Sequence, residues 1–369
     1  MTPPTSTLII GGGIVGAALC YELARRGADV TLLEARQIAA GATGAAIGTL
    51  SYAPSSQMPA AWHRLAAPSL AAHRALAAHL SAVLDDGPTW QWPGRLSVAT
   101  DNQSEKYVRE RLREDVAAGD AGEWLDKQAI HAREPALGGR VQGGSFKPGQ
   151  GWVDGAALTR ALVAAATRYG AVVHEAHPVD TLLWQGSRVV GATAGRATFR
   201  AAATVIAAGL GSATIDETLS APLHAVRGQA LYLPLPNDAP ALRHFVSGVG
   251  IYMVPEGNGV SMGSTHEHVA QRGNTAAGIA KLLSNGLTLI PALGKADWSQ
   301  ARPWSGLRPA TPDKIPLIGP DPDHAGLWWA TGHFRSGILL APRTATLLAN
   351  AILDGDAVDE AWSVGRFRG

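Results

Sequence analysis

The stretch "STLIIGGGIVGAALCYELARRGADVTLLEA", residues 6–35, decides the fold of this chain. Its wholly apolar run Leu8–Ile10 predicts a short strand in the middle of a parallel sheet. Ile14–Arg26 predicts a helix that a glycine ends, and Val30–Leu33 predicts a second strand that stops at Glu34. Strand, helix and strand in this order form a βαβ unit, so the sequence predicts an α/β fold.

The turn before the predicted helix contains Gly11, Gly13 and Gly16 in the spacing G-x-G-x-x-G. The first glycine permits a tight turn, the second lets the backbone approach a pyrophosphate, and the third lets helix and strand pack closely. Glu34 ends the second strand, where a carboxylate binds the hydroxyls of an adenosine ribose. The pattern predicts a Rossmann-like dinucleotide-binding domain, and the alternative is a glycine-rich turn in an unrelated α/β protein.

The glycines leave NAD and FAD open as cofactors. The next segment, "GATGAAIGTL", residues 41–50, follows the second strand and is rich in small residues. Small residues with exposed N–H groups suit a loop that lies against a bulky flat ligand and its diphosphate. The segment therefore favours FAD as the cofactor. The alternative is that residues 41–50 form a flexible surface loop without a ligand.

Bulk composition narrows the class of protein. A chain of 369 residues is too long for one small core, so two domains are expected. The formal net charge is +1 and no run of like charges occurs, which argues against nucleic acid as a main partner. The single cysteine, Cys20, fits a reducing compartment, and the sequence has neither a signal peptide nor a membrane-spanning stretch. We therefore expect a cytoplasmic protein.

The rest of the chain predicts a second domain. Ala60–Leu84 has the pattern of a helical pair, Trp90–Thr100 of a strand, and Asp154–Tyr169 of a capped helix. Leu223–Ser264 alternates apolar and polar residues between Pro and Gly, which is typical of an antiparallel sheet. We expect the nucleotide-binding elements at residues 1–84, 145–222 and 300–369, and a substrate-binding domain inserted as residues 85–144 and 223–299.

A helix predicted near the C-terminus begins without its usual charge. The stretch "ATGHFRSGILLAPRTATLLANAILDGD", residues 330–356, predicts a helix from Ser336 that Gly355 ends. The start of a helix attracts negative charge, because its first N–H groups are unpaired and its dipole is positive there. No Asp or Glu occupies this start. A negative or electron-rich group from outside the chain is therefore expected at this position.

Three blocks of sequence resemble the FAD-dependent amino-acid oxidase family, which includes D-amino-acid oxidase, sarcosine oxidase and glycine oxidase. They are "GGGIVG…LLEA", "ATGAAIGTL" and "WSGLRPATPDKIPLIG…WWATGHFRSGILLAP". The last block is the most specific, and the resemblance extends over nearly the whole chain. The likeness is strongest to the glycine oxidase branch of thiamine biosynthesis. The resemblance implies a Rossmann-like FAD-binding domain with an inserted antiparallel-sheet substrate domain.

The resemblance also implies cofactor contacts. It places the start of the C-terminal helix against the pyrimidine edge of the flavin ring, so that the reduced flavin supplies the missing negative charge. It also implies that the adenine contacts backbone atoms of Val179. The residues that the resemblance and the glycine pattern together place against FAD are Gly11, Gly13, Ile14, Val15, Gly16, Glu34, Ala35, Ala42, Thr43, Ile47, Gly48, Thr49, Val179, Gly209, His333, Phe334, Arg335, Ser336, Gly337, Ile338 and Leu339.

For the substrate, the resemblance implies that Arg308 in "GLRPATPD" binds a carboxylate with two parallel hydrogen bonds. Tyr252 in "GIYMVP" matches a tyrosine that also contacts the carboxylate. Arg335 and Thr49 are further candidates, and Thr49 stands where glycine oxidase has a methionine. Without the resemblance, Arg308 would be interpreted as a surface residue and Tyr252 as a packed strand residue. No catalytic acid or base is assigned, and no metal is expected.

Sarcosine oxidases bind FAD through a cysteine near this block, and the block here has none, so non-covalent FAD is expected. The implied reaction is oxidative deamination of a small amino acid, by hydride transfer to flavin N5, giving an imine and then a keto acid. The electron acceptor is oxygen or another molecule. Alternatives are a dehydrogenase that passes electrons to a quinone or protein, a proline-like or N-alkylated substrate, or a flavin-bound assembly partner without turnover. A homo-oligomer is left open.

Overall fold

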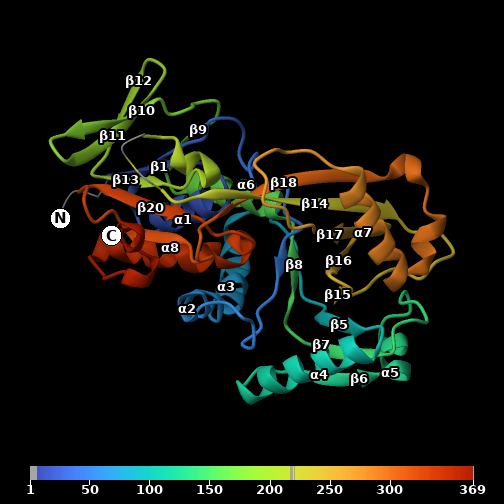
Figure 1. Cartoon of the computed structure of the whole chain (residues 1–369). Coiled ribbons are helices and arrows are strands. Elements are labelled where there is room, and N and C mark those ends of the chain that lie inside the picture. Colours follow the sequence, from blue (N-terminus) through green and yellow to red (C-terminus); the bar gives the residue numbers. More distant parts are fainter. Residues whose placement is uncertain (1–5, 217–218, 220, 369) are drawn as a thin grey trace.

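The first lobe of the protein is built on a largely parallel sheet. The computed structural model describes residues 6–216, 219 and 221–368. Predicted nucleotide-binding residues 1–5, 217, 218, 220 and 369 lie outside the described residues. The sheet that defines the first lobe runs in the order β19 (Leu317–Pro320), β20 (Leu327–Thr331), β13 (Ala203–Ile206), β1 (Ser6–Ile10), β2 (Asp29–Leu33) and β9 (Val172–His174) (Figure 1).

The predicted βαβ unit is confirmed at the centre of this sheet. β1 is parallel to β2, and helix α1 (Ile14–Arg25) crosses between them. α1 is buried along most of its length because it packs against α6 (Gly155–Arg168) and α8 (Gly337–Asp354). A Cβ on Gly16 would lie 2.0 Å from the carbonyl oxygen of Gly11, so the helix approaches the strand as closely as glycine alone allows.

The second lobe is built on a larger sheet. Its strands run in the order β18 (Arg302–Ala310), β14 (His224–Pro234), β17 (Gly259–Gly263), β16 (Ile251–Glu256), β15 (Phe245–Gly248), β5 (Arg95–Ala99), β7 (Gly143–Lys147) and β6 (Glu123–Asp126). Neighbouring strands are antiparallel, as expected, apart from the parallel pair β5 and β15. Helices α4 (Asn102–Ala117), α5 (Lys127–Arg133) and α7 (Ala276–Leu289) complete this lobe (Figure 1).

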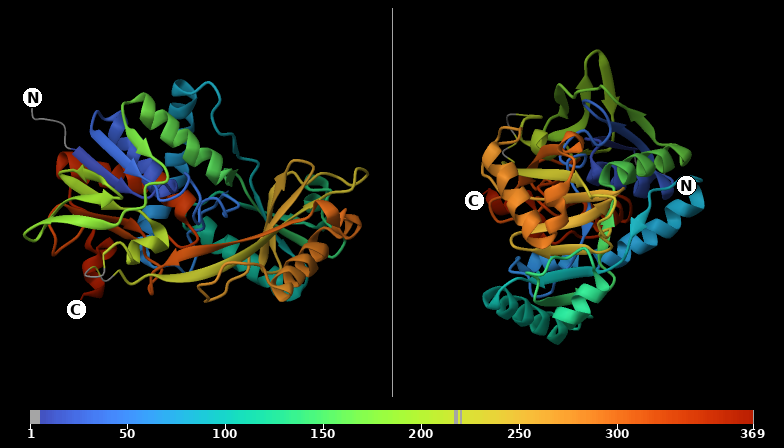
Figure 2. Two further views of the ribbon diagram at one scale, coloured as in Figure 1. Left: turned by 90° about the horizontal axis from the view of Figure 1, so that it is seen from above. Right: turned by 90° about the vertical axis from the view of Figure 1, so that its right-hand side faces the viewer.

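The ribbon of β14 and β18 joins the two lobes. Its register runs from His224 opposite Ala310 to Tyr232 opposite Arg302, and Figure 2 shows the two strands running from one lobe to the other. At the end where His224 and Ala310 are opposite each other, Ala310 also forms a β-bridge with His333, just before α8. The ribbon therefore carries the second lobe directly to the start of α8.

The predicted strand Trp90–Thr100 is wrong in its extent. The chain forms two strands, β4 (Trp90–Gln91) and β5, which join different sheets. Pro93 offers no N–H for a ladder, and Gly94 has φ +91°, so the strand cannot continue through them. β4 pairs with β8 (Gly151–Val153), which also pairs with β3 (Thr49–Leu50).

Two predicted segment limits fall inside the sheet of the second lobe. The limit at residue 145 divides β7, and the limit at residue 300 leaves β18 with the nucleotide-binding segments, yet both strands pair in the second sheet. By strand pairing, both strands belong whole to the second sheet. The division into a cofactor domain and a substrate domain remains a proposal about function.

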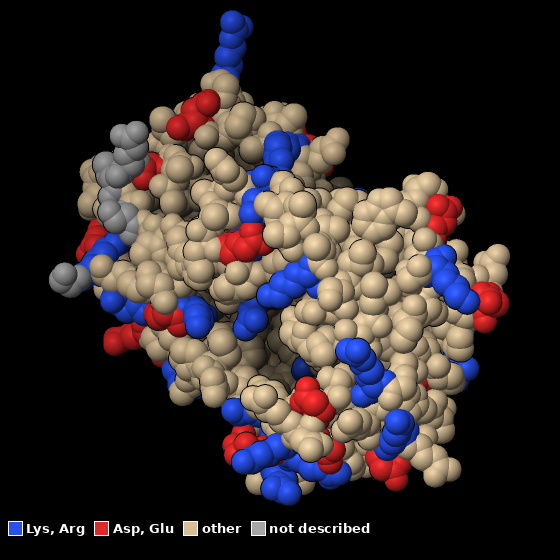
Figure 3. All heavy atoms as spheres, turned by 45° about the vertical axis from the view of Figure 1, so that its right-hand side comes forward, with Lys and Arg blue, Asp and Glu red and all other residues tan. Residues whose placement is uncertain are grey.

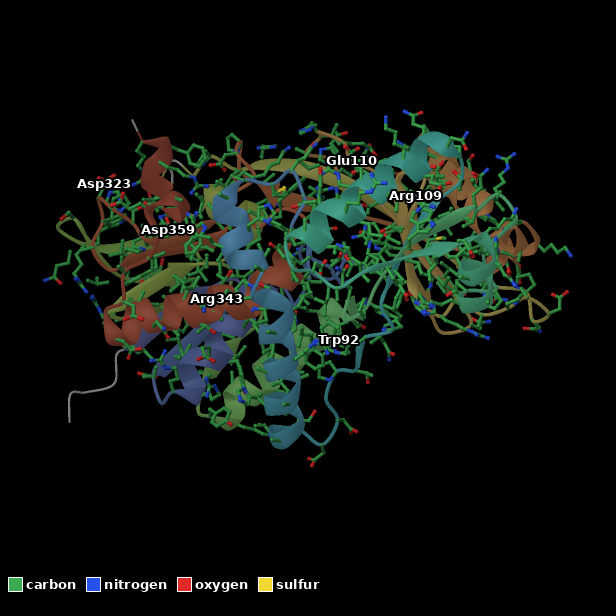
Figure 4. The ribbon with its side chains drawn as sticks, turned by 90° about the horizontal axis from the view of Figure 1, so that it is seen from below. Trp92, Arg109, Glu110, Asp323, Arg343 and Asp359 are labelled. Carbon is green, nitrogen blue, oxygen red and sulfur yellow. The ribbon has the colours of Figure 1, made fainter. Side chains whose placement is uncertain are left out.

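Several further elements surround the first lobe. The helical pair expected over Ala60–Leu84 is confirmed as α2 (Ala60–Ala66) and α3 (Ser69–Val83). A small antiparallel sheet that the sequence did not predict comprises β10 (Thr181–Gln185), β11 (Arg188–Ala194) and β12 (Ala197–Arg200). Figure 4 shows α8, with Arg343, in the first lobe and α4, with Arg109, in the second. Within the described ranges, no helix is both long and apolar enough to cross a membrane.

Candidate active site

A cavity of about 870 Å³ lies between the glycine turn of the first lobe and the sheet of the second. Figure 3 shows the molecule hollowed between its lobes, with Lys and Arg side chains beside the opening. All of the residues predicted to bind cofactor or substrate line this cavity except Gly16, which instead packs α1 against the end of β1. The structure thus brings together residues that are more than 300 positions apart in the sequence.

One end of the cavity is the glycine turn. Gly11 has φ +118°, and a Cβ there would meet the carbonyl oxygen of Ala207 at 2.5 Å. A Cβ on Gly13 would meet only the hydroxyl of Thr43, at 3.4 Å, and would otherwise enter open cavity. Thr43 Oγ1 accepts a hydrogen bond from the Ile14 N–H at 3.1 Å. The turn therefore offers a bare backbone and a helix start to a phosphate.

Glu34 is fixed beside this turn. Its carboxylate accepts hydrogen bonds from the N–H groups of Gly12, at 2.7 Å, and Arg36, at 2.9 Å. Each oxygen keeps a second lone pair, so the carboxylate remains able to accept hydrogen bonds from ribose hydroxyls. Val179 lines the same end of the cavity.

The start of α8 forms another wall. The first helical bond is donated by Leu340 to the Ser336 carbonyl, at 2.8 Å, and Ser336 makes no side-chain cap. In the part of the chain that the structure describes, the N–H groups of Gly337, Ile338 and Leu339 have no acceptor. The start expected at Ser336 is thus confirmed to within one residue, and its unpaired N–H groups border the cavity.

His333 lies under this helix start and is buried. Its Nε2 atom is 3.1 Å from the hydroxyl of Thr344. Burial lowers the pKa of His333 to about 3, so the ring is neutral at neutral pH. The buried, neutral imidazole is therefore interpreted as a group that packs beneath the helix start.

The small-residue loop closes the cavity against the second lobe. Trp304 Nε1 donates to the Ala45 carbonyl at 3.0 Å, and a Cβ on Gly306 would lie 2.5 Å from the Cβ of Ala45. Gly48 has φ +89° and approaches Val153 so closely that a Cβ would lie 1.8 Å from its carbonyl oxygen. The loop is therefore fixed by contacts that only small residues permit.

Arg308 reaches into the cavity from β18. Its Nη2 donates to Ser264 Oγ at 2.6 Å and its Nη1 donates to the Thr265 carbonyl at 3.2 Å. Among the described residues no carboxylate forms an ion pair with it, since the nearby Glu267 pairs with Arg227. Burial lowers the pKa of Arg308, Tyr252 and Glu267 raise it, and Arg335 lowers it. Such a guanidinium is available to an anionic ligand.

The other candidate substrate residues also border the cavity. Tyr252 comes from β16, and its ring lies against Gly263. Arg335 is exposed, with its guanidinium carbon 5.2 Å from the ring centre of Phe334. Thr49 is opposite Trp152 in the pairing of β3 with β8. The roles of Tyr252, Arg335 and Thr49 in binding a substrate remain predictions.

Sequence reasoning missed a set of polar residues on the second lobe. Arg95, Ser247 and Ser264 line the cavity, and Ser51 does so from the loop after β3. The only signal was the side-chain alternation of β5, whose Leu96 and Val98 are buried while Arg95 and Ser97 face away from them. An arginine on such a face is usually interpreted as a solvent contact.

The cavity as a whole fits FAD. It has a bare turn at a helix start, a fixed carboxylate at the end of β2, and unpaired N–H groups at the start of α8. Its size falls within the range of ligand cavities, and its lining includes both the glycine turn and residues of β18. These features match a diphosphate, a ribose and an electron-rich ring, in that order.

Comparisons with known proteins agree with this geometry. A family model described as FAD dependent oxidoreductase matches residues 6–351. The bifunctional protein ThiO/ThiG of Nostoc sp. is 37% identical over 356 residues, which are 94% of this chain and 52% of that protein. The chain therefore spans about half the length of the bifunctional relatives that it matches.

Two further relatives are matched over their full length. Glycine oxidase of Geobacillus kaustophilus is 32% identical, with 95% of this chain and 94% of that protein aligned. A crystal structure of glycine oxidase from the same organism has a TM-score of 0.89, at 30% identity, and the match covers 99% of both chains. Iminodiacetate oxidase from Chelativorans sp. BNC1 has a TM-score of 0.85, at 26% identity, over 97% of this chain and 98% of that chain.

Proposed function

The chain belongs to the family of FAD-dependent oxidoreductases, and from that premise we propose that it catalyses the oxidative deamination of a small α-amino acid. The observation that carries the proposal is Arg308, whose guanidinium reaches the cavity without a carboxylate partner among the described residues. An arginine of this kind is suited to the α-carboxylate of a substrate.

The cofactor would be held by the residues of the first lobe. The turn at Gly11–Gly16 would receive the diphosphate, and Glu34 the ribose hydroxyls. The unpaired N–H groups at Gly337–Leu339 would stabilise negative charge on the ring. When bound, FAD supplies the hydride acceptor for the substrate α-carbon. The chain itself contributes binding and orientation.

The second lobe would hold the substrate. Arg308 would bind the α-carboxylate, with the Tyr252 hydroxyl as a second donor, and the two would set the position of the α-carbon. Ser264 and Thr265 hold the guanidinium in place. Since His333 is neutral and buried, we infer that no protein acid or base is needed when the substrate amine binds in its neutral form.

The names of the relatives support an order of candidates. Glycine is the first, because two of the compared proteins are named glycine oxidase. D-amino acids and amines with an N-substituent follow, the second supported by the relative named iminodiacetate oxidase. A flavoprotein without turnover is kept as the competing function and is an outcome of the test below.

The test is anaerobic mixing of the flavin-loaded protein with D-, L- and N-methyl amino acids while the flavin absorbance is followed. We expect at least one small amino acid to bleach the flavin, and matched amines without a carboxylate to react much more slowly. Steady formation of peroxide in air would identify an oxidase, and turnover with a dye alone would identify a dehydrogenase. Yellow protein that no amine bleaches would overturn the proposal.

We also propose a cytoplasmic location and leave assembly to measurement. Cys20 is a free, buried thiol, and burial raises its pKa to about 12, so it is a structural residue rather than a reactive one. A chain whose one cysteine is used in this way suits a reducing compartment. Cell fractionation tests the location, and light scattering of the purified protein tests for a homo-oligomer.

A further inference from the structure

Arg95 is a second guanidinium at the cavity. It lies at the start of β5, and its Nε and Nη2 atoms donate to Ser247 Oγ at 3.1 and 3.0 Å. Its Nη1 atom donates to Ser51 Oγ at 2.9 Å, and Ser51 donates in turn to Gln150 Oε1 at 2.7 Å. Hydroxyl groups from two separate segments therefore fix the guanidinium plane at the cavity wall.

Arg95 has no anionic partner within the described residues. Two other cations of the second lobe that are buried or half-buried do have one: Lys147 pairs with Asp115 and Asp120, and Arg227 pairs with Glu267. Burial lowers the pKa of Arg95, while the charge of the more distant Asp115 raises it. Arg95 is half-buried and no carboxylate contacts it, which is costly for a charge that is partly held away from water, so its position at the cavity wall points to an anionic ligand.

The sheet register places Arg95 near the proposed substrate site. Ser247, which Arg95 contacts, is opposite Tyr252 in the pairing of β15 with β16. Tyr252 is in turn opposite Gly263, and the next residue, Ser264, accepts from Arg308. The two guanidinium groups thus sit at strands β15 and β17, which are roughly 10 Å apart at the usual spacing of strands. Tyr252 lies on β16, the strand between β15 and β17.

We propose that Arg95 binds a second carboxylate of the substrate, so that within the proposed class of small amino acids those with two carboxylates are preferred to glycine, which the names of the relatives alone place first. Arg308 would hold the α-carboxylate, and Arg95 would hold a carboxylate carried by the side chain or by the amine nitrogen. The span between the two guanidinium groups suits a short dicarboxylate, since each guanidinium would bind the carboxylate at one end of it. This inference rests on the proposed function, because that proposal assigns the first carboxylate to Arg308.

A purely structural role for Arg95 makes a different prediction. In that case the residue ties β5 to β15 and to the loop at Ser51, with its guanidinium carbon 5.3 Å from the ring centre of Phe245. Its loss would then lower stability and weaken ligands with one or two carboxylates by the same factor. The affinity for a ligand with two carboxylates, divided by that for a ligand with one, separates the two roles. A general loss of order lowers both affinities by the same factor and leaves this ratio unchanged.

The experiment compares glutarate with butyrate, two unreactive acids of similar length, in the flavin-loaded protein. Binding is followed by the flavin spectrum and by calorimetry in the wild type, Arg95→Met, Arg95→Lys and the control Arg74→Met. Arg74 is exposed, lies over the Trp92 ring at 4.3 Å and does not line the cavity, so its loss removes one charge without touching the site.

We expect glutarate to bind the wild type and Arg74→Met more tightly than butyrate by about 30-fold or more, as for a charged hydrogen-bonded pair in a closed site. Arg95→Met should bring the ratio close to one, and Arg95→Lys should give an intermediate value. A ratio near one in the wild type, a ratio that survives in Arg95→Met, or failure of glutarate to bind would overturn the inference.

Turnover then identifies which kind of second carboxylate is used. Aspartate and glutamate carry it on the side chain, and iminodiacetate carries it on the nitrogen, with alanine and N-methylglycine as the respective one-carboxylate controls. A preference for either pair that Arg95→Met abolishes supports the inference, and no preference in both pairs contradicts it. If no amine bleaches the flavin, the proposed function fails, while the glutarate ratio still decides whether Arg95 binds an anion.

Discussion

A Cβ on Gly228 would lie 2.0 Å from Nη2 of Arg308, so the guanidinium occupies the space that a side chain on β14 would need. Arg308 starts on β18, and its side chain passes across β14 at Gly228 to reach Ser264 beyond β17. The reach of Arg308 into the cavity thus depends on a glycine that lies 80 residues earlier in the sequence.

Gly228→Ala should therefore displace the arginine without changing its charge. We expect a fall in kcat/KM for amino acids that approaches the loss in Arg308→Ala, because the added methyl group would lie 2.0 Å from Nη2 and 2.7 Å from Nη1 and so would push the guanidinium out of its present position. FAD content should be normal. Gly139→Ala is the matched control, since an added Cβ there meets nothing within 4 Å. Kinetics of Gly228→Ala equal to those of the control would show that Arg308 can work from another position.

The second prediction concerns the cofactor turn. Gly13→Val should give folded protein without flavin, because its side chain would fill the cavity space proposed for the diphosphate. The flavin absorbance per protein, together with the thermal unfolding curve, checks this. Gly87→Val, at an exposed position with nothing within 4 Å, should keep its flavin. A yellow, folded Gly13→Val protein would remove the diphosphate assignment.

The third prediction is that the flavin is held without a covalent bond. The block Trp304–Gly319 has no cysteine, and the thiol of Cys20 is buried in α1. Precipitation with acid should release all of the flavin into the supernatant, where its fluorescence is measured. Flavin that stays on the denatured chain after washing would contradict the expectation.

The fourth prediction follows from the buried histidines. Burial lowers the pKa of His333 to about 3 and that of His73 to about 4, from the ordinary 6.5. Below pH 6.5 the unfolded chain takes up protons at both rings and the folded chain does not, so the free energy of unfolding falls as the pH falls. The contribution of these two neutral rings to the free energy of unfolding is fully present above pH 6.5 and is lost progressively as the pH falls towards 3.

Denaturant unfolding of apoprotein at pH 7.5, 6.5 and 5.5, roughly spanning the onset of this window, measures the slope. His333→Gln should be less sensitive to pH than the wild type, whatever its stability at pH 7.5, because one of the two rings is gone. His63→Gln, which removes a half-buried histidine away from His333 in the sequence, is the control. The same slope in His333→Gln and the wild type would show that His333 is protonated in the folded state.

Local sequence signals were sufficient to predict the elements that we propose hold the cofactor. The glycine turn, the strand ending at Glu34 and the uncapped start of α8 each show their character within about ten residues, and the structure has all three at one cavity. Arg308 was reached through the family resemblance alone, since an arginine in a Pro-rich segment has no local mark of its role. Its orientation depends on Gly228, which no local pattern links to it.

The residues that were missed depend on long-range pairing. Arg95 meets Ser247 because β5 pairs in parallel with β15, about 150 residues away. The contact could not be found from the prediction of one strand over Trp90–Thr100. The turn at Gly94 divides that segment and places β5 in a different sheet from β4. The register between distant strands is set by the packing of the whole sheet, which periodicity within one strand does not contain.

The measurement that tests the central claim most directly compares Arg308→Ala and Arg308→Lys with the wild type, for an amino acid and for the corresponding amine without a carboxylate. We expect kcat/KM for the amino acid to fall in Arg308→Ala by about 2–5 kcal/mol, roughly 30- to several-thousand-fold, with normal FAD content and little change for the amine. Arg308→Lys should also be impaired, because lysine lacks the planar two-point contact. If kcat/KM for the amino acid stays within a few-fold of wild type in Arg308→Ala, carboxylate recognition lies elsewhere, and the α-amino-acid assignment is wrong.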